Sequence, residues 1–164
     1  MIIEIDQIKK LLPHRDPFLY LDKCDILEIG IKGLGYKKYT DKEFFFKGHF
    51  PNMPIVPGVI LIETLAQTAG VIVAKGFDNN NNKSVLFMSI SKAKFRKPVF
   101  PNDEIVFEVN LLNNIKNVYK FSGIAFKENT KVCEAEFSAM IINKESKEIF
   151  WNNKYIPNYQ IIIY

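Results

Sequence analysis

Residues 48–70, GHFPNMPIVPGVILIETLAQTAG, bring the chemically capable side chains of this chain into one short segment. His49 stands at the start of a proline-broken loop, and Glu63 is the one carboxylate in the apolar run that follows. A carboxyl group on an apolar helix loses hydration, which raises its pKa and suits it to act as a general acid. The alternative is that Glu63 faces solvent, a subunit interface or a structural partner.

The apolar run predicts a helix from about residue 57 to residue 75. Pro57 suits a first helical position, and Gly76 suits a helix stop. Gln67 comes one turn after Glu63 and therefore projects from the same face. The apolar residues that cover nearly the whole circumference are Val59, Ile60, Leu61, Ile62, Leu65, Ala66, Ala69, Val71, Ile72 and Val73. Such a helix belongs in a protein core.

The beginning of this helix adds a third chemical group. Helix N-termini present unpaired N–H groups and the positive end of the dipole, so the amide of Gly58 would stabilise a carbonyl oxygen that gains negative charge. His49, Gly58 and Glu63 would then supply a base, a backbone donor and an acid. His14, in LPHRDPF, is the only other histidine, and an ordinary structural role suits either ring as well.

Composition limits the class of protein. A chain of 164 residues, 48% of them hydrophobic, is long enough for one domain with a proper core, and a net charge of +4 demands no nucleic-acid partner. Cys24 and Cys133 show neither a metal-ligand spacing nor a disulfide framework, which favours a reducing, cytoplasmic location. Acidic residues near the N-terminus argue against a secretory signal, and prolines interrupt residues 50–74, so no membrane span is predicted.

The rest of the chain is typical of a sheet. A short amphipathic helix is expected from Ile5 to Leu12, and residues 18–29 and 31–39 would pair as a hairpin, with Gly30, Gly33 and Gly35 available for a bend or bulge. Further strands are predicted at 85–95, 104–113, 118–127 and 131–142, and their short connectors favour antiparallel neighbours. Residues 79–82 are predicted to be a polar loop. The expected architecture is α+β, with a curved sheet of about six strands around one helix.

Three blocks of the sequence carry a resemblance to a known family. LPHRDPFLYLDK, FFKGHFPNMPIVPGVILIETLAQTAG and KAKFRKPVFPNDEIVFEV resemble the signature blocks of FabZ-type 3-hydroxyacyl-[acyl-carrier-protein] dehydratases of type II fatty acid synthesis. With VCEAEFSAMI, the similarity spans roughly residues 4–143. The resemblance implies a single hot-dog domain over 1–143, and leaves 144–164 as an extension of unknown role.

The resemblance also implies roles for the residues above. His49 would be the catalytic base and Glu63 the catalytic acid, while the Gly58 amide would polarise the thioester carbonyl and Gln67 would help to position the acid. The related FabA-type dehydratase-isomerases have aspartate at the position of Glu63, so the glutamate favours dehydration alone. The implied reaction converts a (3R)-3-hydroxyacyl-[acyl-carrier-protein] to the trans-2-enoyl form without a metal or an organic cofactor.

The resemblance further implies an assembly of at least two chains. Two hot-dog subunits would join their sheets edge to edge, with each active site built from His49 of one chain and Glu63 of the other. Relatives commonly assemble further into trimers of dimers.

Substrate contacts are predicted in two regions. Phe50, Ile55, Val59 and Leu86 could line an acyl tunnel, although each also suits an ordinary core. Lys92, Lys94, Arg96 and Lys97 lie in KAKFRK, where an acidic acyl carrier protein could dock by charge complementarity. A solvated strand face explains the same charges.

Two other classes of function remain open from the sequence. A hot-dog thioesterase or hydratase acting on coenzyme A thioesters would share the fold. A non-catalytic acyl-binding or regulatory module would need an output element, and no DNA-binding segment is visible in the sequence. The combination of His49, Gly58 and Glu63 argues for the enzyme.

Overall fold

The structure is a computed structural model that describes residues 1–77 and 83–143. The loop predicted at 79–82 and the extension at 144–164 lie outside the described residues, and the domain boundary at residue 143 stays a prediction. The elements in chain order are β1 (Ile2–Glu4), α1 (Ile5–Leu11), β2 (Lys23–Glu28), β3 (Lys32–Lys38), the 3-10 helix η1 (Phe44–Lys47), α2 (Gly58–Ala74), β4 (Lys83–Phe95), β5 (Glu104–Ile115), β6 (Val118–Lys127) and β7 (Thr130–Asn143).

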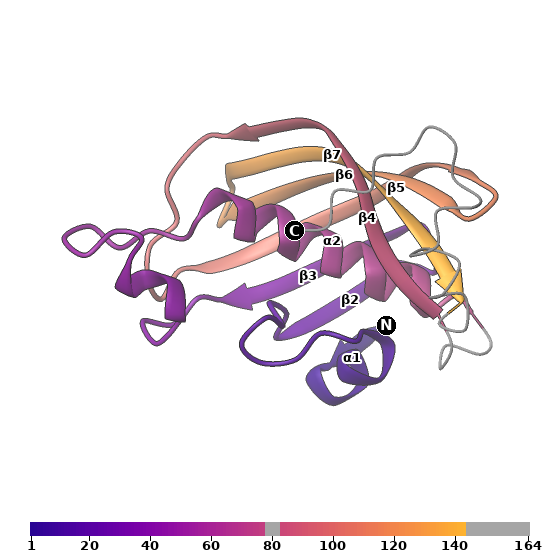
Figure 1. Ribbon diagram of the computed structural model, residues 1–164, viewed down its shortest axis with the longest axis horizontal. Helices are drawn as coiled ribbons and strands as arrows, with labels where there is room; N and C mark the ends of the chain where they lie inside the picture. The colour runs from indigo at the N-terminus through magenta and orange to yellow at the C-terminus, as the bar shows by residue number, and fades with distance from the viewer. Residues whose placement is uncertain (78–82, 144–164) are drawn as a thin grey trace, which may run out of the picture.

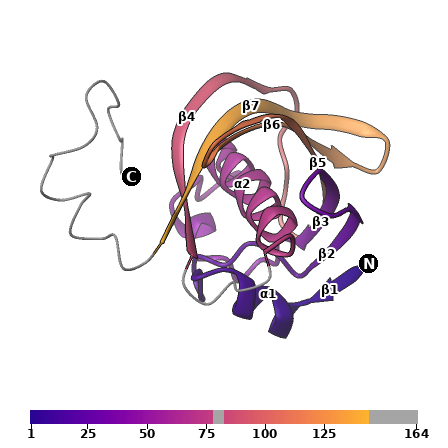
Figure 2. The same cartoon turned by 90° about the vertical axis from the view of Figure 1, so that its right-hand side faces the viewer.

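One antiparallel sheet of seven strands, in the order β1-β2-β3-β5-β6-β7-β4, curves around α2 (Figure 1). Figure 2 looks nearly along α2 and shows the sheet passing over it, with α1 on the opposite side. The predicted arrangement of a sheet wrapped around one helix is therefore confirmed. The sheet has seven strands rather than about six, because β1 is only three residues long and too short to show a periodicity.

Helix α2 is buried on all sides except one. Of its residues, only Gly58, Val59, Glu63 and Ala66 escape full burial. Its buried hydroxyl groups are satisfied within the core, since Thr64 Oγ1 donates to Ile60 O at 2.7 Å and Thr68 Oγ1 to Thr64 O at 2.8 Å. The helix begins one residue later than predicted, with Pro57 as its N-cap. The carboxylate thus lies on the single open stripe of an otherwise apolar helix.

The β2–β3 hairpin differs from its prediction in detail. Only β2 of the extended segment 18–29 pairs in the sheet, and the bulge lies between Ile26 and Glu28. Gly33 and Gly35 lie in β3 and face α2, because a Cβ on Gly35 would clash with Thr68 Oγ1 and lie 2.9 Å from Leu21 Cδ2. These glycines let the sheet approach the helix closely rather than bend the strand.

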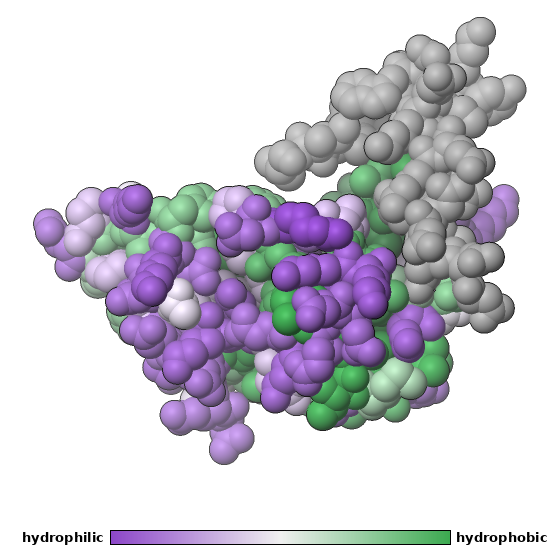
Figure 3. Space-filling view, turned by 90° about the horizontal axis from the view of Figure 1, so that it is seen from below, coloured by the Kyte–Doolittle hydropathy of each residue, from purple (hydrophilic) through white to green (hydrophobic). Residues whose placement is uncertain are grey.

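The hydropathy of the surface agrees with a core built around α2. The face that carries α1 is mostly hydrophilic, with smaller hydrophobic areas (Figure 3). Cys24 and Cys133 are both free and buried. None of the described helices is long and apolar enough to cross a membrane.

Candidate active site

His49 is held by a short loop that closes on itself. Ile55 N donates to His49 O at 3.0 Å, and His49 Nδ1 lies 3.0 Å from Ile55 O. Between them, the backbones of Phe50 and Met53 bond to each other in both directions. Because a carbonyl oxygen only accepts, Nδ1 carries the hydrogen, and Nε2 of a neutral ring keeps its lone pair. The loop therefore leaves Nε2 of a neutral His49 ring able to accept a proton.

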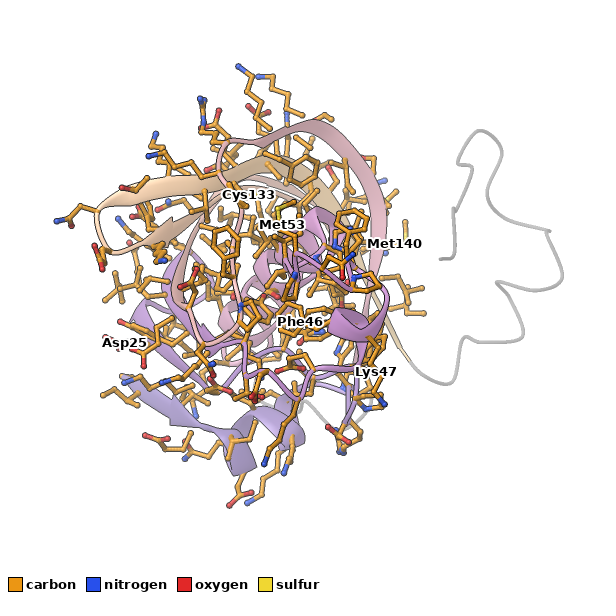
Figure 4. The ribbon with its side chains drawn as sticks, turned by 90° about the vertical axis from the view of Figure 1, so that its left-hand side faces the viewer. Asp25, Phe46, Lys47, Met53, Cys133 and Met140 are labelled. Atoms are coloured by element: carbon orange, nitrogen blue, oxygen red, sulfur yellow. The ribbon has the colours of Figure 1, made fainter. Side chains whose placement is uncertain are left out.

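The loop is anchored to the core on both sides. Before it, η1 buries Phe46, and after it Val56 N donates to Val99 O at 2.8 Å. Figure 4 looks onto this end of the molecule, where Phe46 lies among packed side chains and Lys47 lies towards the rim. The ring of Phe50 stacks on that of His49, with the centroids 4.2 Å apart. These contacts restrict the orientation of the imidazole.

A cavity of about 450 Å³ joins His49 to the beginning of α2. Its walls include His49, Ile55, Gly58, Val59 and Phe95. Within the described residues, the Gly58 N–H has no hydrogen-bond partner, and no side chain caps the helix. A Cβ on residue 58 would lie 2.5 Å from the ring of Phe95, so any other residue would require that ring to move. The cavity therefore combines the His49 imidazole with an unpaired backbone donor.

Glu63 is held by a hydrogen bond from Gln67, which lies one turn later on α2. Gln67 Nε2 donates to Glu63 Oε1 at 2.9 Å and to Phe18 O at 2.9 Å, and Gln67 Oε1 accepts from Tyr20 N at 2.8 Å. The amide thus ties the carboxylate to the loop before β2 while satisfying its own polar atoms. The predicted positioning role of Gln67 fits this geometry.

Burial makes Glu63 a weak acid. Its side chain is 20% exposed, and this desolvation raises the pKa of the carboxyl above its ordinary value, opposed by the Gln67 hydrogen bond. His14 Nε2 lies 3.4 Å from the same oxygen that Gln67 contacts. Burial therefore shifts the carboxyl towards the protonated state, which is the state that a general acid requires.

One chain does not place Glu63 in the cavity that contains His49. Glu63 is absent from the residues that line it. Five helical residues from Gly58 to Glu63 give about 7.5 Å along the axis and roughly 140° around it. His49 and Glu63 therefore occupy separate places in the described chain.

The predicted tunnel residues are only partly brought together. Val59 and Ile55 line the cavity, whereas Phe50 and Leu86 do not. Val59 is 68% exposed and Phe50 48% exposed, so neither belongs to the core. The sequence did not single out Phe95, because a phenylalanine at the end of a strand gives no signal of a cavity wall.

The four basic residues predicted to dock the carrier differ in their ion pairs. Lys92 pairs with Glu136 at 2.7 Å, and Arg96 pairs with Glu134 at 2.6 Å, both across to β7. Lys94 and Lys97 form no ion pair within the part of the chain that the structure describes. Of the four predicted docking residues, Lys94 and Lys97 are therefore the two whose charge is not paired with a carboxylate within the described residues. Among the described residues, no three His, Cys, Asp or Glu side chains gather as a metal site.

Comparison with known proteins gives consistent matches. The FabA-like domain pattern matches residues 12–136. The 3-hydroxyacyl-[acyl-carrier-protein] dehydratase FabZ of Sulfurovum sp. is 43% identical over 149 residues, which cover 88% of this chain and 100% of that protein. The FabZ of Granulibacter bethesdensis is 45% identical over 142 residues, which cover 86% of this chain and 84% of that protein.

A solved structure matches the fold. The dehydratase heterocomplex ApeI:P of Xenorhabdus doucetiae gives a TM-score of 0.72 at 17% identity, over 90% of this chain and 97% of that chain. Likeness at this level of identity concerns the fold alone. The hot-dog fold predicted from the sequence is thereby confirmed.

The raised pKa of Glu63 predicts a specific dependence of stability on pH. Because the folded carboxyl keeps its proton to higher pH than the unfolded one, its contribution is most favourable below the ordinary value of 4.5 and is lost as pH rises through the folded pKa. Glu63→Gln does not titrate and still accepts from Gln67. We compare the melting temperatures of Glu63→Gln and wild type at each pH. The variant's melting temperature minus that of wild type should be larger by a few degrees at about pH 8 than at about pH 4.

Glu104→Gln is the matched control, because the side chain of Glu104 is 75% exposed. Its melting temperature should follow that of wild type across the same range. An equal difference between Glu63→Gln and wild type at both pH values would contradict the raised pKa.

Proposed function

The chain belongs to the FabZ-type 3-hydroxyacyl-[acyl-carrier-protein] dehydratases of the FabA-like family, and from this we propose that it removes water from 3-hydroxyacyl thioesters on acyl carrier protein. The product would be the trans-2-enoyl thioester of type II fatty acid synthesis. The observation that carries the proposal is the cavity that combines the His49 imidazole with the unpaired Gly58 amide. A cytoplasmic location stays a prediction from the sequence.

The base acts on the carbon next to the thioester carbonyl. His49 Nε2 removes a proton from C2, because Nδ1 is occupied by its hydrogen bond to Ile55 O. Negative charge develops on the carbonyl oxygen, and the Gly58 N–H stabilises it at the N-terminus of α2. One such donor is typically worth about 3 kcal/mol of transition-state stabilisation.

The acid acts on the departing hydroxyl group. Electrons from the C2–H bond form the C2=C3 double bond, the C3–O bond breaks, and Glu63 donates its proton so that water leaves. Burial of Glu63 supports this role because it raises the pKa of the carboxyl, which then holds its proton to a higher pH than usual. After one turnover His49 carries an extra proton and Glu63 has lost one, and exchange with solvent restores both.

A complete site requires a second copy of the chain. Among the described strands, β4 pairs only with β7 and leaves its other edge open. Ile90 and Phe95 on this strand are 47% and 56% exposed, and a long open edge with apolar side chains favours pairing with another strand. Because Phe95 also lines the His49 cavity, a partner along β4 would adjoin that cavity. We infer that Glu63 enters it from the partner. The trimer of dimers stays a prediction.

The alternatives differ in their products. A thioesterase or hydratase acting on coenzyme A thioesters would release free thiol or prefer the free coenzyme, and a binding module would release nothing. The relatives at 43% and 45% identity are named as dehydratases, which favours elimination.

We expect the purified protein to form the conjugated enoyl thioester from 3-hydroxybutyryl-[acyl-carrier-protein], followed by ultraviolet absorbance. His49→Ala and Glu63→Gln should each lower kcat by about 10²- to 10⁴-fold, because each removes one proton transfer. Size-exclusion chromatography should show unchanged assembly. Turnover of Glu63→Gln near the wild-type value would refute the acid assignment, and release of free thiol without enoyl product would favour a thioesterase.

A site shared between chains predicts complementation. In a dimer of one His49→Ala chain and one Glu63→Gln chain, one site loses both groups and the other keeps both. Random reassembly of equal amounts should therefore restore about a quarter of wild-type activity if the site is built across a two-fold axis. Each variant mixed with itself is the control. Failure to restore activity in subunits shown to exchange would place both groups in one chain.

Carrier recognition should depend on the unpaired charge of Lys94. Lys94→Glu is expected to raise KM for the carrier-linked substrate several-fold, with less effect as salt rises, because charge complementarity assists association. A small 3-hydroxybutyryl thioester without carrier should react as with wild type. Lys116→Glu, in the β5–β6 turn, is the matched control because it lies about 20 Å away along β7. Equal effects of both variants would refute this docking surface.

A further inference from the structure

Two side chains converge on the same oxygen of Glu63. Gln67 Nε2 donates to Oε1 at 2.9 Å, and His14 Nε2 lies 3.4 Å from it. Within the described residues, no hydrogen bond or ion pair involves Oε2. The distance from His14 exceeds that of an ordinary N–H···O bond, but catalytic contacts are often long in substrate-free structures and shorten when substrate binds. The two carboxyl oxygens therefore have different surroundings.

The loop that carries His14 is fixed from both ends. The Arg15 guanidinium donates to Lys9 O at 2.9 Å, Leu12 O at 2.9 Å and His14 O at 2.6 Å, which ties the loop to the C-terminal end of α1. On the other side, Gln67 holds the backbone of Phe18 and Tyr20. The imidazole is thus placed against Glu63 by a loop with little freedom to move away.

Burial determines which nitrogen of His14 carries the hydrogen. Nδ1 is buried and has no hydrogen-bond partner within the described residues. An unpaired buried N–H costs more than an unpaired acceptor, so the hydrogen belongs on Nε2, which faces Glu63. Protonation of the ring would place an unpaired donor on buried Nδ1. A neutral ring with its hydrogen on Nε2 is therefore favoured.

We propose that His14 is a positioning residue that, with Gln67, confines the acidic proton of Glu63 to Oε2. Two N–H groups aimed at Oε1 leave no room for a proton on that oxygen. Oε2 is then the atom that delivers the proton to the leaving hydroxyl. This inference rests on the proposed function, and it assigns to the second histidine a role in orienting the acid.

The charges around the pair agree with this assignment. Burial, followed by the nearby Arg15, lowers the pKa of His14, while burial raises the pKa of Glu63. The Tyr20 hydroxyl is the other titratable group that Glu63 influences, and burial raises its pKa to about 12. The lowered pKa of His14 favours its neutral ring near pH 7, and burial shifts the Glu63 carboxyl towards its protonated form.

The tautomer can be tested in the wild-type protein. The chain contains two histidines, and the structure assigns them opposite tautomers. Nitrogen-15 NMR of histidine-labelled protein near neutral pH should show one ring with its hydrogen on Nδ1 and one with its hydrogen on Nε2. His49→Asn should remove the first set of signals. A His14 ring that is charged, or that carries its hydrogen on Nδ1, would overturn the proposal.

The catalytic effect is tested by a matched pair of variants. His14→Phe keeps the bulk and burial but has no donor, whereas His14→Gln places an amide N–H near the position of Nε2. Loss of one net hydrogen bond should lower kcat about tenfold in His14→Phe with KM nearly unchanged. The alkaline limb of its pH profile should move to higher pH, because a carboxylate without this donor is less stable. His14→Gln should stay within about threefold of wild type.

The outcomes separate this inference from the proposed function. If the wild type forms enoyl product and His14→Phe keeps its kcat and pH profile, His14 only fills space and the proposal is wrong. If the wild type forms no enoyl product, the proposed dehydration fails, and the NMR measurement alone still decides the tautomer. If His14→Phe does not fold, the wild-type tautomer and the activity of His14→Gln carry the test.

Discussion

The structure depends on burying an almost wholly apolar helix inside a single curved sheet. Burial of α2 on every side but one stripe leaves Gly58, Val59, Glu63 and Ala66 as its partly open residues. The core gains from each apolar side chain that enters it, roughly 1.5–3 kcal/mol for a large one. A carboxylate tolerates this position only on the open stripe and with a hydrogen-bond donor. The same burial that stabilises the fold therefore creates a weak acid with a raised pKa.

Two sets of polar contacts hold Glu63 and His49 in separate places. Gln67 and His14 surround Glu63 from α2 and from the loop after α1, while the loop of residues 49–55 fixes the other imidazole through its own backbone. The two histidines therefore differ in their surroundings, since Nδ1 of His49 has a hydrogen-bond partner and Nδ1 of His14 is buried without one among the described residues. One ring keeps a lone pair on Nε2, and the other offers a hydrogen there. A hydrogen bond to Ile55 O decides the tautomer of His49, whereas the burial of an unpartnered Nδ1 favours the opposite tautomer for His14.

The sequence predicted the elements with a strong period and missed features that depend on contacts between distant segments. The helix at 57–75, the four long strands and the hairpin were found, since each carries many residues of one pattern. The ion pairs of Lys92 and Arg96 with β7 were not foreseen, because they depend on the register between β4 and β7. The contact between His14 and Glu63 was missed because it depends on how the loop after α1 packs against α2. In the sequence, His14 stood out only because it is the one histidine besides His49.

The separation of His49 and Glu63 in one chain connects assembly to chemistry. Glu63 lies more than one helical turn beyond Gly58 and outside the cavity that the start of α2 forms with the His49 loop. A single chain could join them only by bending the helix or moving the anchored loop, and either change would break buried packing. Pairing along the open edge of β4 needs neither, because that strand already lines the cavity through Phe95. An open strand edge, usually a liability, would then be the element that completes the site.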